Sequence, residues 1–113
     1  MKIKQLVLAL ALAAPLTSFA QDMATHNHQT QSPATQEYMA GMDKMHQDMM
    51  AGMQESDPDN AFAKGMIAHH QGAIAMAETE LKYGKDPEMR KLASDIIRAQ
   101  KGEITQMENW LKK

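Results

Sequence analysis

The chain has 113 residues, 43% of them hydrophobic, with a formal net charge of −2 and no cysteine. The slightly acidic balance argues against nucleic-acid binding, which requires a basic patch. The lack of cysteine excludes disulfides, cysteine-ligated zinc fingers and thiol redox motifs. Twelve methionines and five histidines are the chemically unusual part of the composition.

The first twenty residues have the three parts of a secretory signal peptide. Lys2 and Lys4 provide a positive start, residues 6–14 form an apolar run, and Ala20 ends a small-residue cleavage motif. The run is shorter than the ~20 residues of a transmembrane helix, so cleavage is preferred to retention as an anchor. We therefore expect a periplasmic protein without membrane attachment after cleavage. The mature chain would have 93 residues and a formal charge of −4.

Residues 21–34 are expected to form a flexible arm, followed by a helical domain at residues 35–113. The arm is rich in Gln, Thr, Ser and Asn and has no apolar periodicity. Its Met23, His26 and His28 either capture metal weakly or belong to a polar tail without function. The sequence does not distinguish these two alternatives.

The domain is predicted to be all-α, because apolar residues recur at spacings of three and four and no segment alternates with a period of two. The first helix is expected over residues 33–54. The second begins at Asp57-Pro58 and ends near Gly84, and the third begins at Asp86-Pro87 and runs close to Lys113. In both starts the aspartate caps the helix and the proline fits its first turn. Short connections predict an antiparallel bundle of three to four helices.

The tandem histidines His69 and His70 give the strongest indication of chemistry. They lie on the second helix, and Met66 precedes them by three and four residues. Imidazole nitrogen and thioether sulfur form a soft ligand set that favours copper, above all Cu(I), over calcium or magnesium. Adjacent residues on a helix point about 100° apart, so we expect only one of the two to face the bundle centre.

The first helix carries more methionine than packing requires. Between Tyr38 and Met53 it has six methionines and no Leu, Ile or Val. Leucine and isoleucine specify a core better than methionine, so this choice indicates a chemical role. His46 shares a helix face with Met42 and Met49, which is equally consistent with a metal ligand and with a hydrogen-bonded core residue.

The short turns give a first estimate of which residues face each other. A reversal near residue 56 would place Met66 near His46, and a reversal near residue 85 would place His69 and His70 near Gln100. Gln100 and Glu103 are alternatively half-exposed hydrogen-bonding residues, and on periodicity alone Met76 is core filler. One level of the bundle would then hold Met42, Met45, His46, Met49, Met66, His69, His70, Gln100, Glu103 and Met107.

No catalytic motif is present in the sequence. There is no Glu-x-x-His pair of the kind that di-iron bundles use, which disfavours a metal-dependent oxidase. There is also no His-Glu-x-x-His, nucleophile elbow or glycine-rich phosphate loop. We therefore expect that the protein is not an enzyme.

Four segments of residues 36–113 follow a pattern: Asp59-x-x-Phe62, Met66-Ile67-x-His69-His70-Gln71-x-Ala73, Met76-Ala77 and Gln100-x-x-Glu103-Ile104-x-x-Met107-x-x-Trp110-Leu111. This pattern resembles the CopM-like family of small exported bacterial proteins, formerly a family of unknown function. The resemblance implies a ferritin-like bundle that binds copper in the periplasm. It implies metal ligands at Met66, His69, His70, Met76, Glu103 and Met107. At Ala68 the family often has proline, so the second helix is expected to be straighter here.

Together these features predict a copper-binding protein that sequesters or passes on Cu(I), with Cu(II) and Ag(I) as alternatives. Glu103 would orient a histidine or complete a Cu(II) site. Expected partners are copper ions and proteins of copper efflux or copper chaperoning, and the oligomeric state is left open. The alternative function is a metal-independent, methionine-rich interaction module whose histidines sense pH. The expected ligands are His46, His69, His70, Met42, Met45, Met49, Met66, Met76, Met107 and Glu103.

Overall fold

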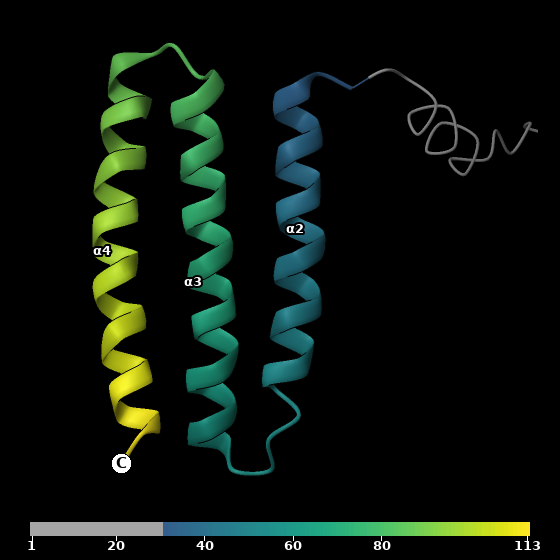
Figure 1. Cartoon of the computed structure of the whole chain (residues 1–113), viewed down its shortest axis with the longest axis vertical. Coiled ribbons are helices and arrows are strands. Elements are labelled where there is room, and N and C mark those ends of the chain that lie inside the picture. The colour runs from purple at the N-terminus through teal and green to yellow at the C-terminus, as the bar shows by residue number, and fades with distance from the viewer. Residues whose placement is uncertain (1–30) are drawn as a thin grey trace, which may run out of the picture. The chain divides into compact units, whose positions relative to one another are not determined.

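A computed structural model describes residues 31–113, which form three α-helices and no strand. α2 spans Pro33–Gly52, α3 spans Pro58–Tyr83 and α4 spans Pro87–Leu111 (Figure 1). The predicted all-α, antiparallel arrangement is confirmed. The expected signal peptide and most of the expected arm lie outside the described residues. Within residues 31–113, every helix is too short or too polar to cross a bilayer.

Each helix begins with the same local signal. The side chain of the N-cap residue accepts a hydrogen bond from the backbone N–H three residues later, and a proline follows the cap. Proline fits this position because its missing N–H would have no partner within the helix. The predicted starts at Asp57 and Asp86 are therefore confirmed. The three capping bonds are Thr35 to Ser32 at 3.1 Å, Asn60 to Asp57 at 2.9 Å and Met89 to Asp86 at 3.0 Å.

The three helices lie side by side in one layer, with α3 in the middle (Figure 1). α3 contacts α2 on one side and α4 on the other, whereas the described α2 and α4 make no contact with each other. On α3, Gly72 lies against Met45 of α2, and His70 contacts Glu103 of α4. Gly72 and His70 point in nearly opposite directions from the helix axis. The layer therefore has two broad faces that no other described helix covers.

Small residues bring α2 and α3 close together. A Cβ added at Gly52 would lie 2.9 Å from the Lys64 carbonyl carbon, and one at Gly65 would lie 3.0 Å from the Met53 side chain. In the expected alignment of α2 with α3, Met66 lies beside His46. The observed contacts displace α2 along α3 by more than one helical turn from that alignment. That estimate was wrong because the approach of the glycines, rather than the middle of the turn, sets the register.

The turn between α3 and α4 is held by Arg90. Its guanidinium donates to the carbonyl oxygens of Leu81 at 2.7 Å and Gly84 at 3.0 Å. Carbonyls at a helix C-terminus have no partner within the helix, so Arg90 satisfies the end of α3 while joining it to α4. The predicted stop at Gly84 is confirmed, and the contact between His70 and Glu103 agrees with the facing residues expected for this hairpin.

Spacings of three and four predict a seam of α3 that faces the other helices, made of Phe62, Met66, His69, Ala73 and Met76. This stripe lies on an open face instead. Phe62 is 65% exposed and Met76 is 48% exposed. Among the described residues the only buried apolar side chains are four alanines, and no large side chain is fully buried. The seam prediction was wrong because small residues make the helix contacts. The large exposed apolar side chains are Met39, Met42, Met50, Met53, Phe62, Met76, Tyr83, Met89, Leu92 and Trp110.

Candidate metal centre

The ten expected ligands fall into three groups. The first lies between α3 and α4, the second lies between α2 and α3, and the third projects from one broad face of the layer, which we call the methionine face. The between-helix groups are His70 with Glu103, and Met45 with Met49. The third group is assigned to the methionine face by helical spacing from the residues that contact α3. It consists of Met42, His46, Met66, His69, Met76 and Met107, together with Phe62, Leu92 and Trp110.

His70 is buried, at 5% exposure, where α3 meets α4. Its Nε2 contacts the Glu103 carboxylate, which can only accept a hydrogen bond when ionised. The ring therefore donates its Nε2–H, and in neutral imidazole the lone pair remains on Nδ1. Among residues 31–113, neither the buried Nδ1 of His70 nor the buried Oε1 of Gln100 has a hydrogen-bond partner. A buried imidazole nitrogen with a free lone pair is chemically suited to bind a metal ion.

His69 points in a different direction from its neighbour. It is exposed, and its ring lies 5.9 Å from that of His70, with an angle of 62° between the ring planes. The expectation that the two histidines point in different directions is confirmed, but neither faces a bundle centre, because α2 and α4 do not close around one. One imidazole thus belongs to the helix interface and the other to the methionine face.

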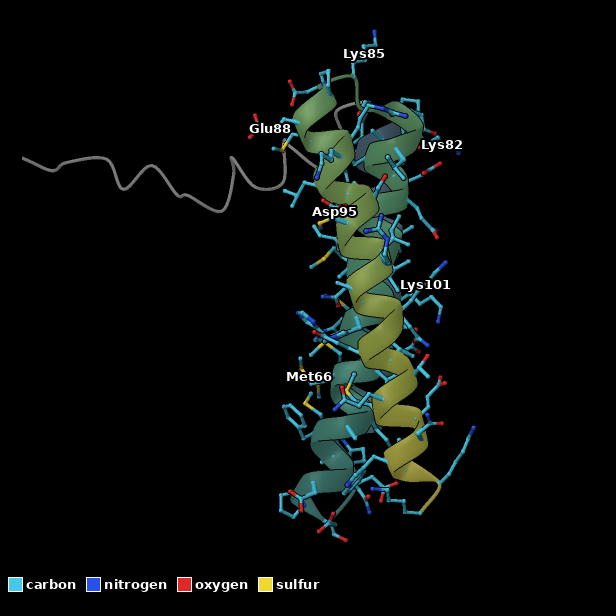
Figure 2. The ribbon with its side chains drawn as sticks, turned by 90° about the vertical axis from the view of Figure 1, so that its left-hand side faces the viewer. Met66, Lys82, Lys85, Glu88, Asp95 and Lys101 are labelled. Carbon is cyan, nitrogen blue, oxygen red and sulfur yellow. The ribbon has the colours of Figure 1, made fainter. Side chains whose placement is uncertain are left out.

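The methionine face gathers thioether sulfur from all three helices. Met66 projects from this face, whereas Lys82 and Lys101 project from the opposite face (Figure 2). The sulfur atoms in the same view lie mainly on the Met66 side. Soft ligands are therefore concentrated on one surface, although they are spread along it.

Met45 has a packing role in this structure. Its side chain occupies the notch at Gly72, where an added Cβ would lie 2.9 Å from the Cβ of Met45. Glu103 lies on the other side of α3 from Met45 and Met49. The single level of ligands from all three helices that the sequence suggested is not formed, because α2 and α4 flank α3 instead of closing around a common centre.

Nitrogen and oxygen ligands alone do not form a metal site in residues 31–113. This part of the chain has no group of three or more His, Asp or Glu side chains placed to hold a metal ion. A metal site with three or more side-chain ligands in this part of the chain would therefore require other donors, such as methionine sulfur. That requirement agrees with the chemistry of Cu(I), which accepts thioether and imidazole ligands.

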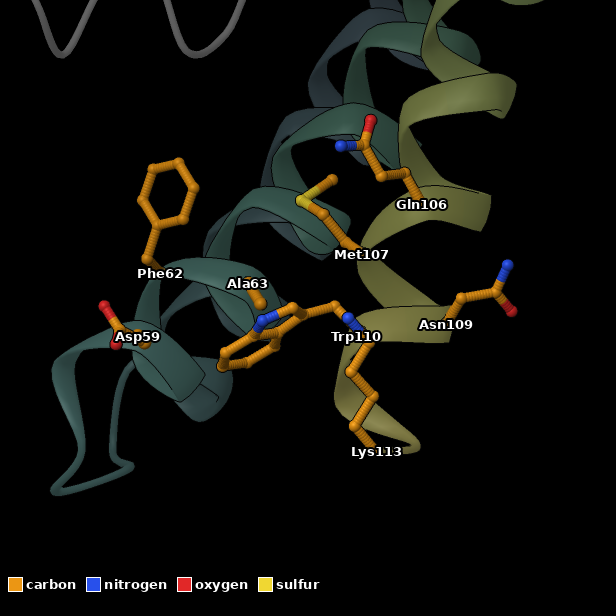
Figure 3. Close-up of a pocket in the computed structure, with 8 residues that line it drawn as sticks. All are labelled: Asp59, Phe62, Ala63, Gln106, Met107, Asn109, Trp110 and Lys113. Carbon is orange, nitrogen blue, oxygen red and sulfur yellow. The ribbon is translucent and has the colours of Figure 1, made fainter.

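The sequence reasoning found no role for the single tryptophan. The structure places Trp110 beside a hollow of about 670 Å³ between the beginning of α3 and the end of α4, with Phe62 and Met107 also in its wall. The indole extends from α4 toward Ala63 of α3 (Figure 3). The spacing of three between Met107 and Trp110 was the available signal, because it places both on one side of α4.

The fold and the ligands define a small all-α protein with a methionine- and histidine-rich face. Residues 11–111 match the family described as "Domain of unknown function (DUF305)", and the chain belongs to this family. The chain is also similar to "Uncharacterized protein L153" of Acanthamoeba polyphaga mimivirus, with 42% identity over 53 residues. That match covers 47% of this chain and 35% of the viral protein, so the chain spans about a third of its length.

Proposed function

We propose that this protein binds copper in the periplasm, mainly as Cu(I), for sequestration or trafficking and without catalysing a reaction. The observation that carries the proposal is the gathering of thioether sulfur on one face, together with the buried Nδ1 of His70, which has no partner among the described residues where α3 meets α4. The resemblance to CopM-like proteins and the signal-like start of the chain support the same function and location.

The donor set fits copper better than it fits other metals. Thioethers are soft ligands that select Cu(I), and imidazole binds both Cu(I) and Cu(II). Glu103 fixes the tautomer and orientation of His70 through Nε2, as carboxylates do for metal-binding histidines. Met66 and Met76 supply sulfur from α3, and Met107 supplies it from α4. Silver(I) would be bound by the same soft ligands.

The proposal is tested by competition for Cu(I) against a chromogenic chelator. We expect the native protein to withdraw Cu(I) from the chelator and the double variant His69→Ala/His70→Ala to bind at least tenfold more weakly. Gln71→Ala is the matched control, because this exposed neighbour on the same helix points away from the methionine face. Unchanged binding in the double variant would move the site to the methionines of α2. No competition by the native protein would refute copper binding.

The pH dependence of Cu(I) binding separates the two ligand types. Histidine must lose its proton to bind a metal, whereas thioether sulfur carries none. A site dominated by methionine should therefore retain Cu(I) as the pH falls from 7 to 5, whereas protons compete with the metal at a site dominated by histidine. Loss of most of the affinity between pH 7 and pH 5 would instead assign the main role to His69 and His70.

A metal-independent interaction module is the second candidate function. It is favoured by the ten large apolar side chains that the described residues leave exposed. Methionine-rich surfaces adapt readily to partner proteins because the side chain is flexible and polarisable. Partner binding that persists in a chelator, together with no competition for Cu(I), would favour this alternative.

A further inference from the structure

The three-helix layer does not bury enough apolar surface to account for a stable domain. Domains are normally built from at least two packed layers, because each element must bury its apolar side. Here residues 31–113 form one layer, and its buried apolar residues are alanines. The methionine face is therefore a surface that requires a second layer.

The distribution of lysines allows a copy of the same face to serve as that layer. Lys64 and Lys82 lie about 180° around α3 from Phe62, so the positive charges of the central helix point to the opposite face. Figure 2 shows the same separation for Lys101 of α4. The centre of the face around Met66 and His69 therefore carries no lysine, and an identical face meets no repulsion between ammonium groups there. The carboxylates of the face are Asp59, beside Phe62 and Trp110, and Glu103, which contacts His70.

The area of the face matches that of a stable dimer interface. At ~1.5 Å per residue the 26-residue α3 is about 39 Å long. Three helices at ~10 Å spacing make the layer about 25 Å wide. The face is then about 1,000 Å², somewhat more than the ~800 Å² that each partner contributes to a standard interface.

We propose that a second copy of this chain packs face to face on the methionine face and forms the missing second layer. In a two-fold symmetric contact, the residues at the centre of the patch meet their own counterparts. α3 is the middle helix and His69 lies near the middle of Pro58–Tyr83. His69 and Met66 of both copies therefore lie together at the centre of the dimer.

This arrangement brings together metal ligands that one copy leaves spread over its surface. A single chain holds no cluster of three or more His, Asp or Glu within residues 31–113, whereas the dimer doubles the imidazole and thioether groups around His69. Cu(I) bound there would be shared by the two copies. This second part rests on the proposed copper function, while the dimer itself does not.

The dimer is tested by sedimentation velocity of the purified full chain in a chelator, at low and high protein concentration. We expect a dimer and a melting temperature that rises with protein concentration, as it does when association stabilises the folded state. Leu92→Lys adds a charge at a 49% exposed position of the methionine face that is not an expected ligand. It should raise the dimer dissociation constant at least tenfold. Gln71→Lys adds the same charge on the opposite face and should leave the constant unchanged.

The outcomes separate the dimer from the copper function. A native chain that stays monomeric at all concentrations overturns the dimer, as do equal effects of Leu92→Lys and Gln71→Lys. A chain that dimerises only after residues 1–32 are deleted also overturns it, because the N-terminal segment would then be the occupant. A dimer that does not bind Cu(I) supports the interface and refutes the copper function. Unchanged Cu(I) affinity in monomeric Leu92→Lys overturns only the shared site.

Discussion

The two sides of α3 are packed in different ways. Toward α2, glycines allow the backbones to approach so closely that a Cβ at Gly52 would lie 2.9 Å from Lys64. Toward α4, the interface encloses the imidazole of His70, with Nδ1 unpartnered, and the unpartnered Oε1 of Gln100. Burying polar atoms without partners costs stability, so packing alone explains the α2 side and not the α4 side. The α4 side is therefore where a buried functional group is retained.

The largest effect should come from filling the close contact between α2 and α3. Gly52→Leu places a side chain against the backbone of Lys64 and Gly65, which cannot move aside as a side chain could. We expect the free energy of unfolding to fall by about 3 kcal/mol, at the upper end of overpacking effects. Urea denaturation followed by circular dichroism measures this change.

Gly102→Leu is the matched control for that substitution. An added Cβ at Gly102 meets nothing within 4 Å, so the new side chain has open space. Replacing glycine inside a helix then raises the free energy of unfolding by up to ~1 kcal/mol, because leucine has the higher helix propensity. Equal losses of stability in both variants would show that α2 and α3 are not in close contact at Gly52.

A smaller effect is expected where α3 meets α4. Glu103→Ala removes the one hydrogen-bond partner that the described residues give the buried His70 ring, and we expect a loss of about 1 kcal/mol. The expected loss of stability is small because the Glu103 side chain is 57% exposed, so water can replace its hydrogen bond to His70. Cu(I) affinity should fall by about tenfold or more, since the carboxylate orients the histidine.

Glu108→Ala provides the comparison for Glu103. Glu108 is an exposed residue of the same helix, and its removal should change neither the unfolding free energy nor the affinity for Cu(I) measurably. Glu103→Gln retains a hydrogen-bond acceptor and should restore most of the stability. If Glu103→Ala and Glu108→Ala bind Cu(I) equally, then Glu103 does not orient a ligand.

Local features of this fold could be predicted from the sequence, and the arrangement of its helices could not. The starts at Asp57 and Asp86 were predictable because capping depends on neighbouring residues only. The divergence of His69 and His70 followed from helix geometry. The spacing of apolar residues in the sequence places Phe62 on the same face of α3 as Met66 and Met76. It does not specify which part of the protein covers that face. Whether three helices close around a centre or form a layer depends on contacts between distant residues, here made by glycines.

The smallest effect concerns Glu37, which joins α2 to the end of α3. Its carboxylate contacts the Lys82 ammonium, accepts a hydrogen bond from the Tyr83 hydroxyl at 2.9 Å and lies 3.5 Å from the Thr79 hydroxyl. Lys82, and then Tyr83, lower the pKa of Glu37 below its ordinary value of 4.5. The hydrogen bond to Glu37 in turn raises the pKa of Lys82 above 10.5.

These pKa shifts predict where the contact of Glu37 stabilises the fold. Because the pKa of Glu37 is lower in the folded state, its contribution is present above pH 4.5 and is lost as the pH falls through the folded value. The Lys82 contribution is present below pH 10.5 and is lost as the pH rises through its folded value. Urea midpoints of Glu37→Gln should therefore be lower than native at neutral pH and should converge with native in acid.

Asp95→Asn is the comparison variant for Glu37→Gln. The pKa of Asp95 is also lowered, but by Lys91 on the same helix. Both variants should reduce the acid dependence of the urea midpoint. Only Glu37→Gln should also increase hydrogen exchange in α2, since Glu37 pairs with another helix whereas Asp95 pairs within its own. Exposed ion pairs contribute little, so the difference should be modest and should shrink with added salt. A difference from native that persists in strong acid would show that Glu37 acts through packing instead of charge.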